Sequence, residues 1–182
     1  MEKKWWHHLT AYQIYTRSFC DSNGDGIGDF QGIISKLDYL QELGIGAIWI
    51  SPFNDSPNYD NGYDISDYYA ILKDFGTMAD LEEMIQECEK RDIIVMMDLV
   101  LNHCSHEHPW FLGACKDRNG KYHDYYIWEE GTEDQPPEGS AAFFGGNVWE
   151  WVPQVKEYYY HTFSIQQPDL NWKNENMRQE LY

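Results

Sequence analysis

Oxygen-bearing side chains recur at every second position in one glycine-rich segment, residues 21–29. Such spacing lets a short loop wrap a hard cation in carboxylate, amide and carbonyl oxygens, and Ca²⁺ accepts this set more readily than Mg²⁺, whose geometry is stricter. The segment is not an EF-hand, because Gly32 stands in the position of the bidentate glutamate. A hydrated acidic turn is the alternative. We expect the following ligands: Asp21, Asn23, Asp25, the carbonyl of Ile27, and Asp29.

Carboxylates and phenols gather in residues 60–69. Asp60 is suited to accept hydrogen bonds from sugar hydroxyls, and the ring of Tyr63 is suited to stack on the flat face of a sugar. The same composition is typical of a solvated loop with Asx turns. The residues alone leave both interpretations open.

Asp98 and His103 bracket the end of a long apolar run. A charge at the end of such a run needs a partner, which gives Asp98 a structural role. His103 is suited to donate to substrate oxygens, although a hydrogen-bonded core histidine fits the position too. The neighbouring Cys104, His106 and His108 suggest zinc, but their spacing matches no usual ligand set.

Strand-like and helix-like segments alternate along the first hundred residues. Residues 11–15 read as a short strand, and residues 47–50 and 93–100 have the continuous apolar character of strands covered on both faces. Residues 30–43 and 78–91 have helical periodicity. This alternation predicts an α/β fold with a parallel sheet and outer helices, compatible with a doubly wound sheet or the start of a (β/α)₈ barrel. One stripe of the second helix is expected in the core: Leu81, Met84, Ile85 and Cys88.

The alternation stops after His103. Residues 104–169 show no clear period and are too long for an ordinary connection, so they predict a small inserted domain. Helical composition returns at residues 174–181.

The charge balance limits the partners of this chain. It carries 31 Asp and Glu against 13 Lys and Arg, a net charge of −18. A surface this acidic repels phosphate backbones and anionic lipids, so we expect neither nucleic acid nor a membrane as a partner. No apolar run approaches the ~20 residues of a membrane span. Aromatic residues make up 16%, which suits sugar rings but also suits aromatic packing.

Four cysteines lie far apart without a CxxC pattern, and residues 1–8 lack the apolar segment of a signal peptide. We therefore expect reduced thiols and a cytoplasmic protein. The sequence does not identify a partner chain.

Together these segments resemble the α-amylase family of retaining glycoside hydrolases, and in particular its oligo-1,6-glucosidase and α-glucosidase branch. Residues 98–103 are similar to the first conserved region of the family, and residues 167–171 to the insert signature of this branch. Residues 21–29 resemble its metal loop. Thr16 stands where the family usually has Pro, and Cys104 where it usually has Thr.

The resemblance implies a fold and its boundaries. The chain would form the first three βα units of a TIM (β/α)₈ barrel, with an inserted small domain after strand three. Residues 1–103 would be the N-terminal part of the catalytic barrel, residues 104–169 the inserted domain, and residues 170–182 the start of the next barrel helix. Three strands leave two open sheet edges, so we expect the chain alone to be poorly soluble, to expand or to self-associate.

The resemblance also implies a sugar-binding site. Asp60, Tyr63 and His103 would bind the innermost glucosyl unit, while the insert would line the pocket with Phe144, Phe163 and Gln167. In this family the nucleophilic Asp lies on strand four and the acid/base Glu on strand five. The resemblance therefore places no catalytic residue in this chain.

The implied function is that of the N-terminal part of a retaining α-glucosidase, which removes terminal α-linked glucose from short oligosaccharides. On its own the chain would be inactive. Two alternatives remain: a non-catalytic amylase-like module that binds carbohydrate or a partner, and a calcium-dependent carbohydrate-binding fragment.

Overall fold

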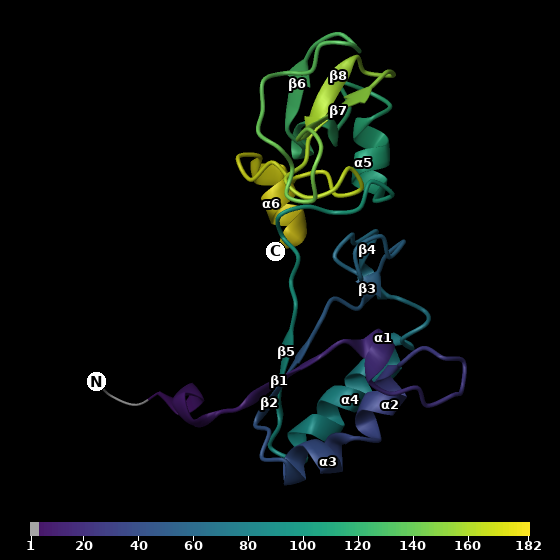
Figure 1. Cartoon of the computed structure of the whole chain (residues 1–182), viewed down its shortest axis with the longest axis vertical. Coiled ribbons are helices and arrows are strands. Elements are labelled where there is room, and N and C mark those ends of the chain that lie inside the picture. Colours follow the sequence, from purple (N-terminus) through teal and green to yellow (C-terminus); the bar gives the residue numbers. More distant parts are fainter. Residues whose placement is uncertain (1–3) are drawn as a thin grey trace. The chain divides into compact units, whose positions relative to one another are not determined.

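The computed structural model describes residues 4–182. Residues 1–3, part of the segment in which we expect no signal peptide, lie outside the described residues. The chain divides into two compact units (Figure 1). Unit 1 comprises Met1–Asp55 and Tyr69–Leu99, and unit 2 comprises Ser56–Tyr68 and Val100–Tyr182.

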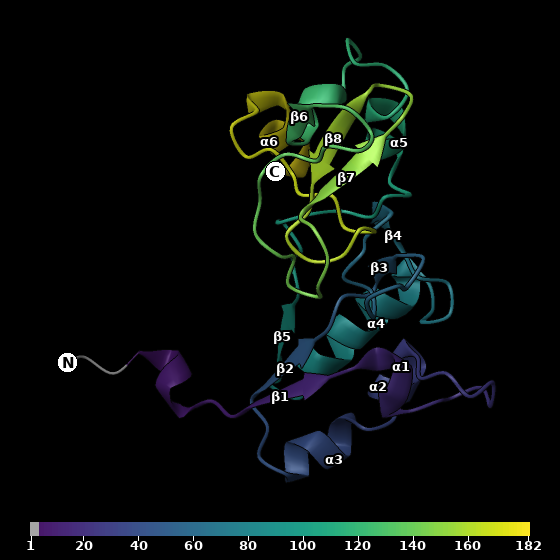
Figure 2. The same ribbon diagram turned by 45° about the horizontal axis from the view of Figure 1, so that its top comes forward.

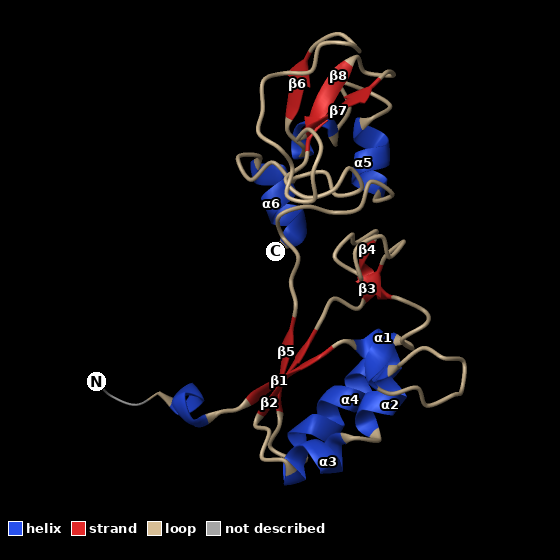
Figure 3. Cartoon of the chain, viewed as in Figure 1, coloured by secondary structure: helices blue, strands red, loops and turns tan. Residues whose placement is uncertain are grey.

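A three-stranded parallel sheet organises unit 1. Strand β1 (Ala11–Ile14) pairs with β2 (Ala47–Ile50), which pairs with β5 (Ile94–Met97). Helices α1 to α4 lie on one side of these strands (Figures 1 and 3), so the predicted parallel sheet with outer helices is confirmed. The other elements up to residue 89 are η1 (Trp5–His8), α1 (Thr16–Phe19), α2 (Phe30–Ile34), α3 (Leu37–Glu42), β3 (Asn54–Asp55), β4 (Asp67–Ile71) and α4 (Met78–Glu89).

One hydrophobic core joins the sheet to its helices. Ile14, Ile48 and Ile50 are fully buried on the face of the strands that meets the helices. Burial of such apolar side chains is the main force that holds strand and helix layers together. The helices contribute Phe30, Ile33, Leu37, Leu40, Leu81, Met84 and Cys88 to the same core.

The helix predicted over residues 30–43 is interrupted. The structure has two helices there, α2 and α3, separated by Ser35 and Lys36. The Ser35 hydroxyl donates to the Gly32 carbonyl at 2.7 Å, and the Lys36 N–H bonds to the carbonyl three residues earlier. Serine competes with the helix for backbone acceptors in this way, and periodicity alone does not reveal the break.

Helix α4 begins at a capping box in which the side chain of Thr77 and that of Asp80 each accept from the other's backbone N–H. Leu81, Met84 and Cys88 of the predicted stripe are buried. Ile85 is 37% exposed, so its assignment to the core was wrong. It lies about 100° around the helix from Met84, at the edge of the buried face.

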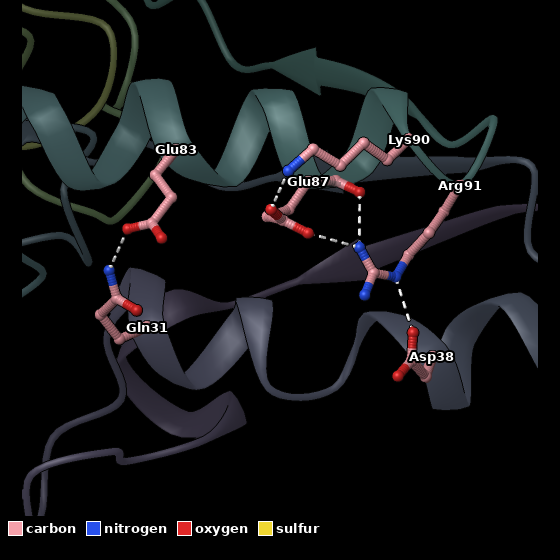
Figure 4. A network of polar contacts seen from close by, with 6 residues as sticks. All are labelled: Gln31, Asp38, Glu83, Glu87, Lys90 and Arg91. Atoms are coloured by element: carbon pink, nitrogen blue, oxygen red, sulfur yellow. Dashed lines mark hydrogen bonds and ion pairs between the residues drawn. The ribbon is translucent and has the colours of Figure 1, made fainter.

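Polar contacts orient the exposed side of α4 against the preceding helices (Figure 4). Arg91 contacts Asp38 and Glu87, each at 2.7 Å, and Gln31 donates to Glu83 at 2.7 Å. The hydrogen bonds that Arg91 donates to Glu87 and Asp38 raise the pKa of Arg91 above its usual value. The Asp38 side chain is 77% exposed, so water screens its ion pair with Arg91 and the pair adds little to stability.

The other face of the sheet is less covered than predicted. Trp49 is 38% exposed, Ile94 38% and Met96 40%, and the register of β2 with β5 places all three on this face. The sequence predicts strands covered on both faces, which holds only when a barrel closes around its interior. Three strands do not close, and β1 and β5 are the edges of this sheet.

Unit 2 contains an antiparallel sheet that the sequence did not predict. Its order is β6 (Trp128–Glu130), β8 (Glu157–Tyr160) and β7 (Trp149–Val152), and the three strands lie side by side in Figure 2. The strands are three or four residues long, and a long loop separates β6 from β7, so they leave little periodicity to detect. The remaining elements are α5 (Pro109–Ala114), η2 (His123–Tyr125) and α6 (Glu175–Leu181).

Aromatic rings form much of the core of unit 2. The ring of Phe111 contacts those of Tyr126 and Tyr159 at centroid distances of 5.0 and 4.9 Å, and stacks on Trp128 at 6.1 Å. Tyr125 and Tyr126 are among the largest fully buried side chains. Packing therefore accounts for part of the high aromatic content.

The division by compactness groups residues 56–68 and 170–182 with the insert. The predicted boundaries at 1–103, 104–169 and 170–182 stay a prediction. All four cysteines are free. Among the described residues, 4–182, no helix is long and apolar enough to cross a bilayer.

His108 provides a pH-dependent test of unit 2. Burial lowers the pKa of His108 to about 4, against the charges of Asp67 and Glu180, which raise it. Its Nδ1 accepts from the Trp110 N–H at 3.1 Å and caps α5, which requires the neutral ring.

An unfolded histidine has a pKa near 6.5, so between about pH 6.5 and 4 the unfolded state binds a proton that the folded state does not. Stability is therefore lost as the pH falls through this range, by roughly 3 kcal/mol at about pH 4. In the protein that contains this chain, His108→Asn keeps a capping oxygen and removes the titration. We expect its thermal midpoint to fall less than that of the wild type between pH 7 and pH 4. Equal losses would contradict this role.

Candidate functional site

The six predicted binding residues all lie in unit 2. Backbone hydrogen bonds pair residues 102–106 antiparallel with residues 166–170: Cys104 donates to Pro168, His106 to Gln166, and Leu170 to Asn102. The Ser105 N–H donates to the Ile65 carbonyl at 2.8 Å and attaches the segment around residue 60. Three stretches that are distant in sequence are thereby brought together.

Asp60 and Gln167 are in direct contact. The Gln167 side-chain amide donates to Asp60 Oδ2 at 2.8 Å across 107 positions of sequence. Gln167 is fully buried, and its side-chain oxygen accepts from the Ser164 N–H. Because both ends of the amide are bonded, its donor is fixed toward Asp60 and orients that carboxylate.

His103 is held by two bonds that define its tautomer. Nε2 lies 3.1 Å from the Tyr63 carbonyl, and Nδ1 lies 3.2 Å from the side-chain nitrogen of Asn102. A carbonyl only accepts and an amide nitrogen only donates, so the proton resides on Nε2. A sugar hydroxyl that accepts from Nε2 must share this proton with the Tyr63 carbonyl.

Electrostatics at His103 oppose its burial. Burial lowers the pKa of His103, whereas the charge of Asp169, the hydrogen bond to Tyr63 and the charges of Asp60 and Asp64 raise it. The ring is only 5% exposed. The net lowering agrees with the neutral tautomer that its two hydrogen bonds require.

Phenylalanine rings lie beside the histidine. The Phe163 ring is 5.2 Å from that of His103 and 6.0 Å from that of Phe144, measured between centroids. Phe143 also contacts Phe163, at 5.6 Å, and it was missed from the sequence. Phe143 and Phe144 are 76% and 61% exposed. The Phe-Phe-Gly-Gly run places an aromatic pair before a turn, and this is the sequence signal from which Phe143 could have been predicted.

Two buried aspartates shape the backbone of the site and were not predicted as site residues. Asp169 accepts from the N–H and hydroxyl of Thr162, at 2.9 and 2.6 Å, next to Phe163. Asp64 accepts from the N–H groups of Tyr59 and Asp60. Sequence reasoning looked for side chains that face a ligand, whereas these face the chain itself.

The predicted metal loop, residues 21–29, forms a series of turns in unit 1. Asp21 accepts from the N–H groups of Gly24 and Gly26, both at 2.7 Å, and Asp25 accepts from that of Ile27 at 2.8 Å. The bonds from Gly26 and Gly24 are the main cause that lowers the pKa of Asp21. Asp29 caps α2 by accepting from the Gly32 N–H.

No group of three or more His, Cys, Asp or Glu converges on one point within residues 4–182. The structure therefore shows no convergence of the residues of the zinc alternative at 103–108, and none of Asp21, Asp25 and Asp29 either. These three carboxylates accept from backbone N–H groups instead. Cys104 is fully buried, and its sulfur lies 3.1 Å from the Tyr126 hydroxyl. Asp98 directly follows β5, and its N–H donates to the Ile50 carbonyl at 3.2 Å.

Comparison with known proteins decides the family. The model of the α-amylase catalytic domain matches residues 13–182. The chain belongs to the α-amylase family. Members of this family share the TIM-barrel fold, so residues 4–182 form the first βα units of a TIM barrel with a small insert.

Individual relatives are similar over the whole chain. An oligo-1,6-glucosidase of Bacillus cereus is 57% identical over all 182 residues. The crystal structure of an isomaltulose synthase from Klebsiella sp. LX3 matches with 52% identity over 100% of the chain and a TM-score of 0.97. That of a Bacillus licheniformis trehalose-6-phosphate hydrolase matches with 48% identity over 99% and a TM-score of 0.95. In each comparison the chain spans about a third (33%) of the relative.

The Asp60–Gln167 contact can be tested by placing a second acid against Asp60. In the protein that contains this chain, Gln167→Glu puts two carboxylates about 3 Å apart, where repulsion and burial oppose ionisation of both. We expect a loss of roughly 2–4 kcal/mol in unfolding free energy at pH 7, partly recovered at pH 5 as the pair retains a proton.

The adjacent Gln166→Glu is the matched control, because the Gln166 side chain is partly exposed. We expect it to change stability by no more than roughly 0.5 kcal/mol. Equal losses in the two variants would show that Gln167 does not face Asp60.

Proposed function

We propose that this chain is the N-terminal part of a retaining α-glucosidase that releases terminal α-linked glucose from short oligosaccharides. The hydrogen bond between Asp60 and Gln167, within a site that also contains His103, carries the proposal. The site contains a carboxylate, an imidazole and aromatic rings, in a member of the α-amylase family. Relatives named as oligo-1,6-glucosidases support the choice of substrate class.

The residues of this chain would bind and orient the glucosyl unit. The carboxylate of Asp60 would accept from sugar hydroxyls, and charged acceptors form the stronger hydrogen bonds. His103 would share its Nε2 proton with a hydroxyl, and the rings of Phe144 and Phe163 would cover the apolar face of the sugar. Tyr63 would contribute its phenol ring from the same turn as Asp60.

The bond-breaking step would use groups outside this chain. Retaining hydrolysis needs a nucleophilic carboxylate and an acid/base carboxyl about 5–5.5 Å apart. We assign neither role to any residue here, and so propose that residues 1–182 alone do not catalyse. The chain spans 33% of the relatives it matches, which leaves room for both groups in the remainder.

The proposal is tested with the whole protein and with the chain alone. We expect the whole protein to release glucose from isomaltose or maltose with retention of the anomeric configuration, and the chain alone to release none. Asp60→Asn should lower kcat/KM on the order of 10–100-fold, the value of a hydrogen bond to a charged group. Asp134→Asn, in an exposed turn of the insert, is the matched control.

Other outcomes would replace the proposal. Binding of isomaltose without turnover by the whole protein would favour a non-catalytic carbohydrate-binding module. Absence of both binding and turnover for every α-glucoside tested would overturn the assignment. Glucose release by residues 1–182 alone would disprove the claim that the reacting groups lie elsewhere.

We further propose that residues 21–29 bind Ca²⁺, with Mg²⁺ as the weaker alternative. Carboxylate, amide and carbonyl oxygens suit this ion. Asp21 Oδ2 and Asp25 Oδ1 each accept one N–H and keep a second lone pair, whereas Asp21 Oδ1 and Asp29 Oδ2 each accept two hydrogen bonds. The lowered pKa of Asp21 keeps that group ionised. Side chains of Asp21, Asn23, Asp25 and Asp29, with the carbonyl of Ile27, would hold the ion and brace the start of α2.

Removal of the cation tests this site. We expect a chelator to lower the thermal midpoint of the whole protein, and added Ca²⁺ to restore it more effectively than Mg²⁺. Asp25→Asn keeps an oxygen for the Ile27 N–H but removes a charge, and should weaken Ca²⁺ binding about tenfold in calorimetry, since affinity follows ligand charge. The exposed Asp92→Asn is the control. Equal affinity in all three proteins, or no binding, would contradict the site.

We propose a cytoplasmic location because the cysteines form no disulfide bonds. All four are free, and burial raises the pKa of Cys104 and of Cys115 to about 12, which keeps these thiols protonated and unreactive.

A further inference from the structure

Asp64 is a fully buried carboxylate in the turn that carries the binding residues. Its Oδ2 accepts from the Tyr59 N–H and its Oδ1 from the Asp60 N–H, both at 2.9 Å. Burying a carboxylate costs several kcal/mol unless hydrogen bonds replace its water. The two hydrogen bonds therefore stabilise the buried carboxylate and at the same time hold the backbone of the turn in place.

The turn needs such an anchor because its backbone is unusual. Asn58, Asn61 and Gly62 have φ of 66°, 50° and 90°, in the left-handed region. Residues other than glycine adopt this region at some cost, and persist there only where surrounding bonds hold them. Within the turn, the Tyr63 N–H donates to the Asp60 carbonyl at 2.9 Å.

Two hydrogen bonds connect the turn to the rest of the site. The Asp60 carboxylate accepts from the Gln167 side chain, and the Tyr63 carbonyl accepts from His103 Nε2. A shift of the Tyr59–Asp60 backbone would move the Asp60 carboxylate relative to both partners. Asp64 thus controls the positions of groups that would contact the sugar, from a place with no exposed surface.

We propose that Asp64 is the positioning residue of the glucosyl-binding turn, which fixes the Asp60 carboxylate by accepting two backbone hydrogen bonds. The proposal rests on the proposed function for the identity of the ligand. The anchoring of the turn by Asp64 does not depend on the proposed function, because it is a property of the backbone.

Asparagine is the informative substitution because it has the same shape but only one acceptor oxygen. In Asp64→Asn one of the two N–H groups faces an NH₂ group, and that bond is lost. We expect kcat/KM on isomaltose to fall about 10–100-fold in the whole protein, as small misplacements of binding groups do. The exposed Asp134→Asn should leave kcat/KM unchanged.

A double-mutant cycle separates positioning from general damage. If Asp64 acts through Asp60, Asp64→Asn should cost less than threefold in kcat/KM once Asp60→Asn is present. A purely structural role predicts the same fold loss in both backgrounds, because independent effects add. Equal losses would overturn the proposal.

Amide exchange keeps the test independent of activity and of whether the variant folds. In the wild-type whole protein, the Tyr59 and Asp60 amides should exchange at least tenfold more slowly than expected for an open turn, and Asp64→Asn should accelerate them. Unprotected wild-type amides would overturn the proposal. Slow exchange together with failure to bind or hydrolyse any α-glucoside would instead refute the proposed function and leave the anchor in place.

Discussion

The antiparallel pairing of residues 102–106 with 166–170 is the constraint on which the candidate site depends. It places Gln167 beside residues 102–106, and from this position the Gln167 side-chain amide donates to Asp60. The sixty or so residues between the paired segments form a loop whose closure entropy rises only slowly with length. Their own core, which includes Phe111, Tyr126 and Tyr159, stabilises the closed arrangement.

The fold of unit 1 could be predicted from the sequence because its elements are regular. Buried parallel strands are apolar runs, and α4 begins at a recognisable Thr77 cap. The break between α2 and α3 was not predictable, because it depends on one hydroxyl, that of Ser35, which selects a local acceptor. Exposure of Ile94 and Met96 could not be read from hydrophobicity either, since an apolar strand looks the same whether or not a barrel closes around it.

The site was predictable only in part, and for a different reason. Asp60 and His103 were candidates from their residue type and position, and Gln167 was named from the resemblance alone. The structure brings Asp60 and Gln167 into contact, although no composition or period links positions 107 apart. Phe143, Asp64 and Asp169 were missed. The two aspartates bond to backbone N–H groups, and a sequence does not show which N–H a carboxylate will meet. The antiparallel sheet of the insert was missed because its strands are too short for a period.

The arrangement separates recognition from chemistry. Relatives named as an oligo-1,6-glucosidase, an isomaltulose synthase and a trehalose-6-phosphate hydrolase are 57%, 52% and 48% identical to this chain. All three are similar to this chain over nearly its whole length, so identity over these residues does not distinguish the three kinds of enzyme. Asp64 and Asp169 accept from backbone N–H groups and Asn102 contacts His103, so each acts on the chain itself. In the glucosidase proposed above, a site held in this way would bind one glucosyl unit, while groups elsewhere in the protein would act on its bond.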